Sequence, residues 1–355
     1  PPSSPRSRVL SSMANLMNTS HWLQRMQLAL SNRKSRRRVA TATLPGEVLE
    51  DRLLLATFSV LNPADQGAGS FRQAILDANS TSGSDRIEFN IPGSGVAAIG
   101  LESPLPALTE RVTIDGWSQP GHVSFPLIVV NGSQAGPGSG LVVNAANSTI
   151  RGLVIQGFDG DGIVLSAAGT IIQGNYIGTN TAGTAALGNS GAGIRLLPGT
   201  RGTTGGNDGR NSTEKTSTTK STTQTVEQER ERNIISGNRN RIVVEGSSST
   251  GNNLTGNYIG TDVTGQFAVP NTEFGILFEG AGANRVGGPT GDEQNVISGN
   301  GRDGIRIEGG SREQVIIGNY IGVAADGVTA LGNEGNGVTI RGGIPGGHSC
   351  VGRIP

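Results

Sequence analysis

The chain has 355 residues, including 57 glycines, and its 28 Lys and Arg residues equal its 28 Asp and Glu residues in number. A formally neutral chain lacks the basic excess typical of nucleic-acid or membrane-surface binding, so we expect no nucleic-acid partner. A single cysteine and three scattered histidines exclude an intrachain disulfide and the usual zinc motifs. The sequence contains no run of 18 apolar residues, so no transmembrane helix is predicted.

The first 56 residues are predicted to be a separate segment. Residues 1–46 contain no acidic residue and eight basic ones: Arg6, Arg8, Arg25, Arg33, Lys34, Arg36, Arg37 and Arg38. This composition is typical of a targeting segment, and equally of a disordered basic tail. We therefore expect residues 1–56 to precede a folded domain that covers 57–355.

A short helix is predicted next, over GSFRQAILDAN (69–79). Ser70 and Gln73 fit a capping box, and Asn79 is expected to end the helix. The apolar residues of this segment recur at helical spacing: Phe71, Ala74, Ile75 and Ala78. A helix with one apolar face can cover the open end of a stack of strands, so residues 57–146 are interpreted as a cap and irregular coils.

From residue 147 onward one phrase recurs: NIISGNRNRIVVEGS starts at Asn233, and NVISGNGRDGIRIEGG starts at Asn295. Aligning such phrases gives six coils over 147–348, each with three short strand-like pieces. Alternate residues of a strand point to one face. The third pieces therefore predict an inward apolar column: Ile163/Leu165, Ile194/Leu196, Ile242/Val244, Ile276/Phe278, Ile305/Ile307 and Val338/Ile340. Such short strands bury a face only when coils pair, which predicts an all-β parallel β-helix.

Asparagine occupies the same corner of five coils: Asn175, Asn233, Asn257, Asn295 and Asn319. Asparagine tolerates left-handed backbone geometry. Its side-chain amide can also donate to the carbonyl of the asparagine in the next coil. We therefore predict a structural ladder of hydrogen bonds along the stack.

Two kinds of coil alternate, because Asn257 and Asn319 begin matching coils 62 residues apart. Only one kind carries a tyrosine and a following loop, at Tyr176, Tyr258 and Tyr320. We expect these tyrosines to point outward and to pack beneath the Ala-Leu or Ala-Val of their loops. A row of sugar-binding aromatic rings is the alternative interpretation.

The coil around Asn233 contains a long insertion, over 209–232. Its sequence includes NSTEKTSTTKSTTQTVEQERER, which is rich in Ser and Thr and nearly free of apolar residues. Such a segment cannot bury enough apolar surface to pack, so we predict a mobile insertion on the coil surface.

Several segments together resemble one group of known proteins. LEDRLLLA (49–56), after RKSRRR, resembles the L-E-x-R-x-L-L element of secreted and surface proteins of planctomycete bacteria. The run from FSVLNPADQGAGSFRQAILDAN to DGWSQPG is similar to the N-terminal cap of bacterial extracellular right-handed β-helix proteins, and the NYIG and NVISGN coils are similar to their repeats. The resemblance covers about residues 34 to 355. It implies a right-handed parallel β-helix and an extracellular or cell-surface location, and it does not fix an activity.

One outward column of the predicted helix carries charge. Glu245, Glu279 and Glu308 are expected on neighbouring coils about 4.8 Å apart, with Arg306 and Arg341 beside them. Stacked carboxylates repel unless a cation compensates, and oxygen-rich clusters suit Ca²⁺. The five residues are thus a candidate carbohydrate or calcium site, and a solvated Glu/Arg ladder without chemistry is the alternative.

Two functions follow from these patterns. The first is a secreted or cell-surface β-helix repeat protein, non-catalytic and monomeric, that serves adhesion or contacts a polysaccharide or cell-surface glycan. The second is a calcium-assisted polysaccharide lyase or glycosidase in which Arg306 is the base or a substrate clamp. An enzyme needs loops that wall a groove around the glutamate row, whereas the loops here alternate between two corners. The sequence therefore favours the first function.

Overall fold

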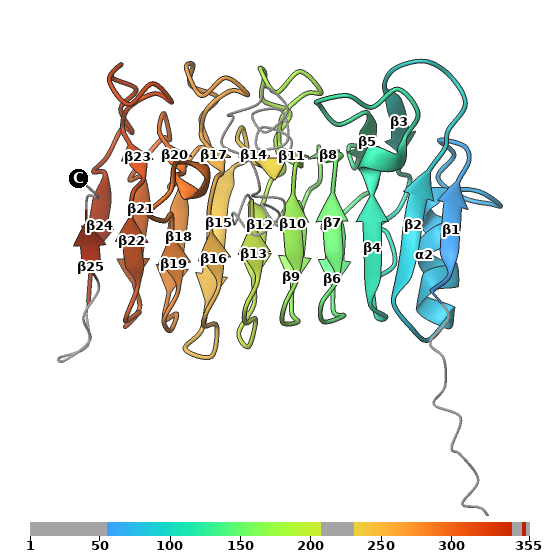
Figure 1. Cartoon of the computed structure of the whole chain (residues 1–355), viewed down its shortest axis with the longest axis horizontal. Coiled ribbons are helices and arrows are strands. Elements are labelled where there is room, and N and C mark those ends of the chain that lie inside the picture. Colours follow the sequence, from blue (N-terminus) through green and yellow to red (C-terminus); the bar gives the residue numbers. More distant parts are fainter. Residues whose placement is uncertain (1–54, 207–230, 343–349, 353–355) are drawn as a thin grey trace, which may run out of the picture. The chain divides into compact units, whose positions relative to one another are not determined.

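The computed structural model describes residues 55–206, 231–342 and 350–352. The predicted segment 1–56 and the predicted insertion 209–232 fall outside these ranges, apart from residues 55–56 and 231–232. The described residues of the domain form a parallel β-helix, in which the chain passes through three parallel sheets once per coil (Figure 1). This architecture confirms the fold predicted from the repeats.

Sheet A contains the first strand of each coil. Among the described residues it has ten strands, and strands of successive coils pair in parallel. Its members in order are β1 (Thr57–Val60), β2 (Asp85–Phe89), β4 (Val112–Asp115), β7 (Thr149–Arg151), β10 (Ile171–Gln173), β13 (Thr204–Gly205), β16 (Asn253–Leu254), β19 (Arg285–Val286), β22 (Val315–Ile317) and β25 (Cys350–Gly352).

Sheet B follows around the coil and has eight parallel strands in the described part of the chain. Its members are β3 (Ala97–Gly100), β5 (Ile128–Asn131), β8 (Leu153–Gln156), β11 (Tyr176–Ile177), β14 (Ile234–Ile235), β17 (Tyr258–Ile259), β20 (Val296–Ile297) and β23 (Tyr320–Ile321). Most of these strands have only two residues, because glycine and asparagine corners limit their length.

Sheet C closes the coil, and the residues that the structure describes give it seven parallel strands. They are β6 (Leu141–Val143), β9 (Ile163–Leu165), β12 (Ala192–Leu196), β15 (Asn240–Glu245), β18 (Ile276–Glu279), β21 (Ile305–Glu308) and β24 (Val338–Ile340). The described ranges also include two 3-10 turns, η1 (Gly116–Ser118) and η2 (Gly291–Glu293), in the connections between sheets A and B.

The predicted inward column is present in sheet C. Ile163 pairs with Ile194, and the same register continues through Ile242, Ile276, Ile305 and Val338. Nearly all of these side chains and their i+2 partners are buried in one continuous core. The exception is the last described rung, where Val338 is half-buried and Ile340 is half-exposed, because β24 is the edge of sheet C among the described residues.

The helix α2 (Phe71–Ser80) covers the first coil beside β1 and β2, as Figure 1 shows. Its four predicted apolar residues are all buried, and Phe71 packs on Phe89 with ring centroids 5.3 Å apart. The Ser70 side chain accepts a hydrogen bond from Gln73 N–H, which confirms the N-cap. Only half of the capping box forms, because the Gln73 side chain donates to Asp77 instead.

The prediction that Asn79 ends α2 is wrong. The helix continues through Ser80. The Asn79 side chain donates to Ala107 O at 2.7 Å and accepts from Thr109 N–H at 2.9 Å, so it fastens the cap to a later coil.

The predicted asparagine ladder is present between sheets A and B. Each side-chain Nδ2 donates to Oδ1 of the next asparagine over 2.8–3.2 Å, from Asn175 through Asn233, Asn257 and Asn295 to Asn319. The expected left-handed geometry is not found at these asparagines. Among the described non-glycine residues, only Asn147 and Glu313 have positive φ, while Gly174, Gly256 and Gly318 supply it directly before three ladder positions.

A second ladder runs between sheets B and C and was not predicted. It joins Asn189, Asn238, Asn271, Asn300 and Asn333 through Nδ2 to Oδ1 hydrogen bonds of 2.9–3.2 Å. These asparagines end the SGN, LGN and VPN phrases of the repeats, so the same repetition that revealed the first ladder could have revealed this one.

The three tyrosines point outward from sheet B, as predicted. They form a column with the aliphatic residues of the intervening coils, separate from the core: Val129, Val154, Tyr176, Ile234, Tyr258, Val296 and Tyr320. The cover differs from the expected Ala-Leu or Ala-Val pairs. Tyr176 lies under the Gly183 turn of its own loop and under Val263 of the loop two coils later, and Ala325 covers the Gly265 turn beside Tyr258 in the same way.

Glycine is required at these loop turns. Gly265 has a φ of +67°, and a Cβ there would lie 2.7 Å from the Ala325 Cβ and 2.8 Å from the Tyr258 ring. Because the tyrosines are buried or half-buried in this way, they do not form an exposed row of aromatic rings.

Removing one ladder amide should weaken the whole stack. Asn257 donates to Asn295, Gly205 O and Thr255 O, and it accepts from Asn233. Asn257→Ala leaves buried carbonyls without a donor, and we expect the free energy of unfolding to fall by about 2–3 kcal/mol in guanidinium denaturation.

The matched control is an asparagine outside both ladders. Asn90 is exposed at the end of β2, so Asn90→Ala should change the free energy of unfolding by less than about 0.5 kcal/mol. Equal denaturation midpoints for the two variants would contradict a stabilising ladder.

Candidate functional site

The predicted glutamate row exists as a geometric feature. Glu245 of β15 pairs in register with Glu279 of β18, and Glu279 pairs with Glu308 of β21. The three side chains therefore lie on consecutive strands of sheet C, each at the C-terminal end of its strand. Glu279 is exposed, whereas Glu245 and Glu308 are partly buried.

An arginine that the sequence patterns did not single out neutralises one end of this row. Arg195 of β12 places its Nε 2.7 Å from an Asp161 carboxylate oxygen and donates through Nη1 to Glu245. The hydrogen bond to Asp161 raises the pKa of Arg195, burial opposes this increase, and the nearby charges of Asp161 and Glu245 add to it. Arg195 thus links three successive coils through two carboxylates.

Arg306 lies at the other end of the row and, unlike Arg195, contacts only carboxylates of its own coil. Its Nε lies 2.6 Å from Glu308 and its Nη1 lies 3.4 Å from Asp303. The hydrogen bond to Glu308 raises the pKa of Arg306 above its ordinary value, since burial offsets it only in part. A general base must lose its proton near neutral pH, so this environment is the reverse of what a catalytic Arg306 requires.

Arg341 lies next to the row without joining it. Its backbone N–H donates to Ile307 O at 2.8 Å, and within the described part of the chain its side chain makes no ion pair with Glu308. The described residues also contain no group of three or more His, Cys, Asp or Glu side chains placed to hold a metal ion. The stacked glutamates therefore do not converge into the predicted calcium site.

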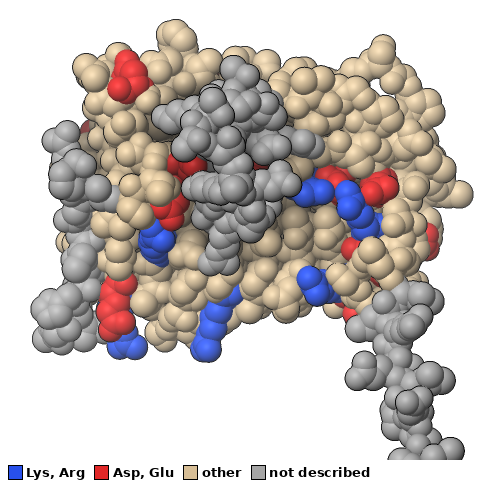
Figure 2. Space-filling view, in the orientation of Figure 1, with Lys and Arg blue, Asp and Glu red and all other residues tan. Residues whose placement is uncertain are grey.

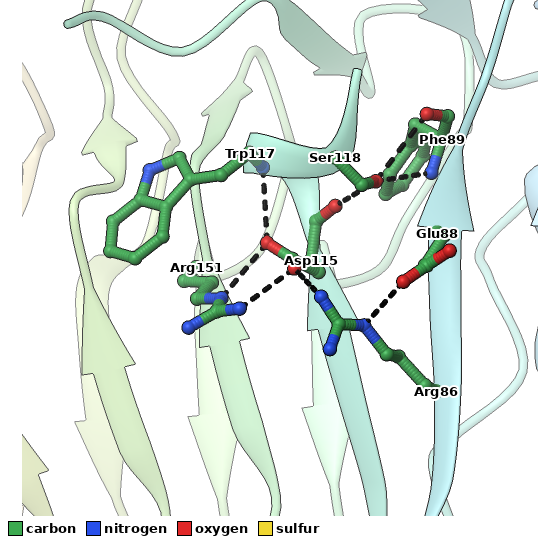
Figure 3. A network of polar contacts seen from close by, with 7 residues as sticks. All are labelled: Arg86, Glu88, Phe89, Asp115, Trp117, Ser118 and Arg151. Carbon is green, nitrogen blue, oxygen red and sulfur yellow. Dashed lines mark hydrogen bonds and ion pairs between the residues drawn. The ribbon is translucent and has the colours of Figure 1, made fainter. Parts of the chain in front are cut away.

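A denser polar network lies on sheet A, near the cap (Figure 3). Asp115 at the end of β4 receives hydrogen bonds from Arg151 at 2.7–2.8 Å and from Arg86, and its side chain is only 3% exposed. Burial alone raises the pKa of Asp115, but the hydrogen bonds and charges of Arg151 and Arg86 outweigh it and leave the pKa below its ordinary value. Trp117 N–H donates to the same carboxylate, and Arg151 lies over the Trp117 ring. The network joins β2, β4 and β7, so its role is to fasten the irregular first coils.

The structure also contains a cavity of about 700 Å³ over the outer face of sheet B. Its floor is the Tyr176–Ile234–Tyr258 part of the outward column. The loops after β11 and β17 and the segment before β5 form its walls. The lining residues are Ser124, Phe125, Tyr176, Thr181, Ala182, Arg232, Ile234, Tyr258, Val263 and Thr264.

Neither this cavity nor a smaller one near the cap is lined by a residue of the glutamate row. The sequence patterns placed possible chemistry on sheet C and missed the sheet B cavity. One signal was present in the sequence. The residue before each ladder asparagine is Gly174, Gly256, Gln294 or Gly318 in four coils, but Arg232 in the coil of Asn233.

Charged residues are scattered over the face of the molecule that Figure 2 shows. Outside the grey regions some basic and acidic side chains lie side by side and others stand alone, and the basic ones form no continuous face in this view. Helices long and apolar enough to cross a membrane are absent from the described ranges.

Comparison with known proteins gives a likeness of fold only. No family model matches the chain, and no curated protein matches it. One similar solved structure is the A-module of a mannuronan C-5 epimerase from Azotobacter vinelandii, with 15% sequence identity, a TM-score of 0.36, and coverage of 84% of this chain and 99% of that one. At this level of similarity the activity of the epimerase is not transferred to this chain.

Asp115 makes the stability of the cap depend on pH. Its folded pKa is lowered, so its contribution is complete above the unfolded value near 3.8 and is lost as the pH falls through the folded value. At neutral pH, Asp115→Asn should lower the free energy of unfolding by about 2–3 kcal/mol, and this difference from wild type should shrink on acidification in denaturant titrations.

The control is Glu88→Gln, because Glu88 is 37% exposed and contacts the same Arg86 at 2.7 Å. Glu88→Gln should change the free energy of unfolding by less than about 0.5 kcal/mol. A deficit of Asp115→Asn that is the same at neutral pH and at about pH 2 would show that the carboxylate charge is not responsible.

Proposed function

We propose that the protein is a secreted or cell-surface β-helix repeat protein that contacts carbohydrate as a monomer and has no catalytic activity. The observation that carries this proposal is the pairing within the glutamate row. Glu245 and Glu308 are bound by Arg195 and Arg306 of the same sheet face, so the charges that suggested chemistry are already paired in structural ion pairs, and the Arg195–Glu245 pair joins two neighbouring coils.

The geometry disfavours a glycosidase. A glycosidase keeps one carboxyl group in an apolar pocket so that this group stays protonated and donates to the leaving sugar. Glu279 is exposed to solvent, and the other two glutamates contact arginine, so none of the three occupies an apolar pocket.

The geometry equally disfavours a calcium-assisted lyase. Such an enzyme needs a converging set of oxygen ligands and a base that can lose its proton. The described residues supply no such ligand set, and Glu308 and Asp303 hold Arg306 in its charged form. Carbohydrate contact is better supported by the sheet B cavity, where aromatic rings and hydroxyl side chains lie together.

The extracellular part of the proposal depends on the N-terminal sequence. The Arg-rich run and LEDRLLLA resemble an export element, and residues 1–54 lie outside the described part of the structure. Support therefore comes from sequence resemblance, and cell fractionation with an antibody to the folded domain would test it.

A single assay separates binding from catalysis. The purified chain is incubated with immobilised acidic and neutral polysaccharides, with calcium or with a chelator, and both retained protein and polymer length are measured. We expect retention on at least one acidic polysaccharide with no shortening of the polymer under either condition. Shortening that Glu279→Gln abolishes, while the variant still binds, would support the lyase or glycosidase alternative and overturn the proposal.

A further inference from the structure

We propose that the sheet B cavity binds one carboxylate-bearing sugar ring of an acidic oligosaccharide, and that Arg232 pairs with the carboxylate. The inference rests on the proposed carbohydrate-contact function and names its site and ligand class. It concerns sheet B and therefore does not involve the glutamate row of sheet C.

The charge of the cavity lining favours an anionic ligand. Arg232 is the only charged residue among the described residues that line the cavity, and no described carboxylate lies within ion-pair distance of it. Arg195 and Arg306 differ in this respect, since each contacts two carboxylates. A single positive charge in a partly enclosed site favours a ligand with one negative charge, and a planar guanidinium suits a carboxylate in particular.

Arg232 is also held in a way that leaves it able to bind. Its guanidinium carbon lies 4.1 Å from the centroid of the Tyr258 ring, close enough for a cation–π contact. Its Nε is buried and has no hydrogen-bond partner among the described residues. A buried donor without a partner is unfavourable, so a ligand that accepts this hydrogen bond would bind with a gain that an exposed arginine does not offer.

The remaining lining of the cavity matches a sugar ring. Phe125 is 46% exposed and offers an aromatic surface against which the apolar face of a sugar can pack. Ser124, Thr181 and Thr264 supply hydroxyl groups. The Thr264 hydroxyl donates to Asp262 at 2.8 Å and accepts from Gln266 N–H at 3.3 Å, which leaves its oxygen one lone pair for a sugar hydroxyl. The volume of about 700 Å³ is within the range of small-molecule sites and accommodates a short oligosaccharide.

The experiment titrates the full chain with tri-galacturonate and with the neutral galactose trisaccharide, using isothermal calorimetry. We expect the acidic probe to bind and the neutral probe to bind about tenfold more weakly or not at all, because only the acidic probe can pair with Arg232. Arg232→Gln should lower affinity for the acidic probe by about tenfold or more and leave that for the neutral probe unchanged.

The matched control removes the same charge outside the cavity. Arg239 is exposed, lies on the same coil and does not line the cavity, so Arg239→Gln should bind tri-galacturonate as wild type does. Equal losses in the two variants would indicate nonspecific charge attraction and overturn the assignment.

A second variant keeps the charge and blocks the space. Ala182 is exposed on the loop that walls the cavity, so Ala182→Trp can fill the site with little risk to folding. This variant should lose tri-galacturonate binding although Arg232 is intact. Wild-type affinity in Ala182→Trp, or in a folded Arg232→Gln, would overturn the proposal.

The outcomes also separate this inference from the function it depends on. If acidic polysaccharide binds the wild-type chain but Ala182→Trp and Arg232→Gln bind it equally well, carbohydrate contact stands and this site is wrong. If no acidic or neutral glycan binds, both are wrong. A sulfated trisaccharide provides the last arm, because preference for it over tri-galacturonate would overturn the choice of a carboxylate.

Discussion

The structure depends on keeping every coil directly above the previous one, and buried asparagine amides enforce this alignment. A strand pair fixes register only for two to four residues here, and a slip by one residue would turn apolar side chains outward. The two amide ladders, headed by Asn175 and Asn189, resist such a slip because each amide has a defined partner in the next coil. The geometry of the glutamate row, the tyrosine column and the cavity depends on this alignment of the coils.

The sequence predicts those features that repeat within a coil. Because strand side chains alternate, the Ile194 column and the outward tyrosines followed from spacing alone, and the Ser70 cap of α2 followed from a local motif. Contacts between distant segments could not be found in this way. Asn79 fastens the cap to Ala107 and Thr109, and the cavity unites Phe125, Arg232 and Thr264 from separate coils. These contacts depend on how the loops fold back over the sheet, and no local sequence pattern encodes that.

Arginine has two different environments in this protein. Arg195, Arg306 and Arg151 stand on strands and contact carboxylates, those of adjacent coils for Arg195 and Arg151 and those of its own coil for Arg306, so their charge is already paired. Arg232 stands at a corner and contacts an aromatic ring. The first environment explains why a charged face need not be a reactive one. The second, a cation without an acidic neighbour among the described residues, is the environment from which we infer a ligand site.

The loops that follow the tyrosine-bearing strands of sheet B overlap one another along the stack. Val263 N–H donates to Gly183 O, and Ala325 N–H donates to Gly265 O, so each loop rests on the loop two coils earlier. The loops of this outer layer therefore repeat every two coils, whereas the strands of the β-helix repeat every coil. Adding a single coil to such a molecule would preserve the core. The loop of a tyrosine-bearing coil would then no longer meet the loop that covers it. Gene duplications that add coils in pairs should accordingly be tolerated, whereas odd additions would expose an aromatic ring.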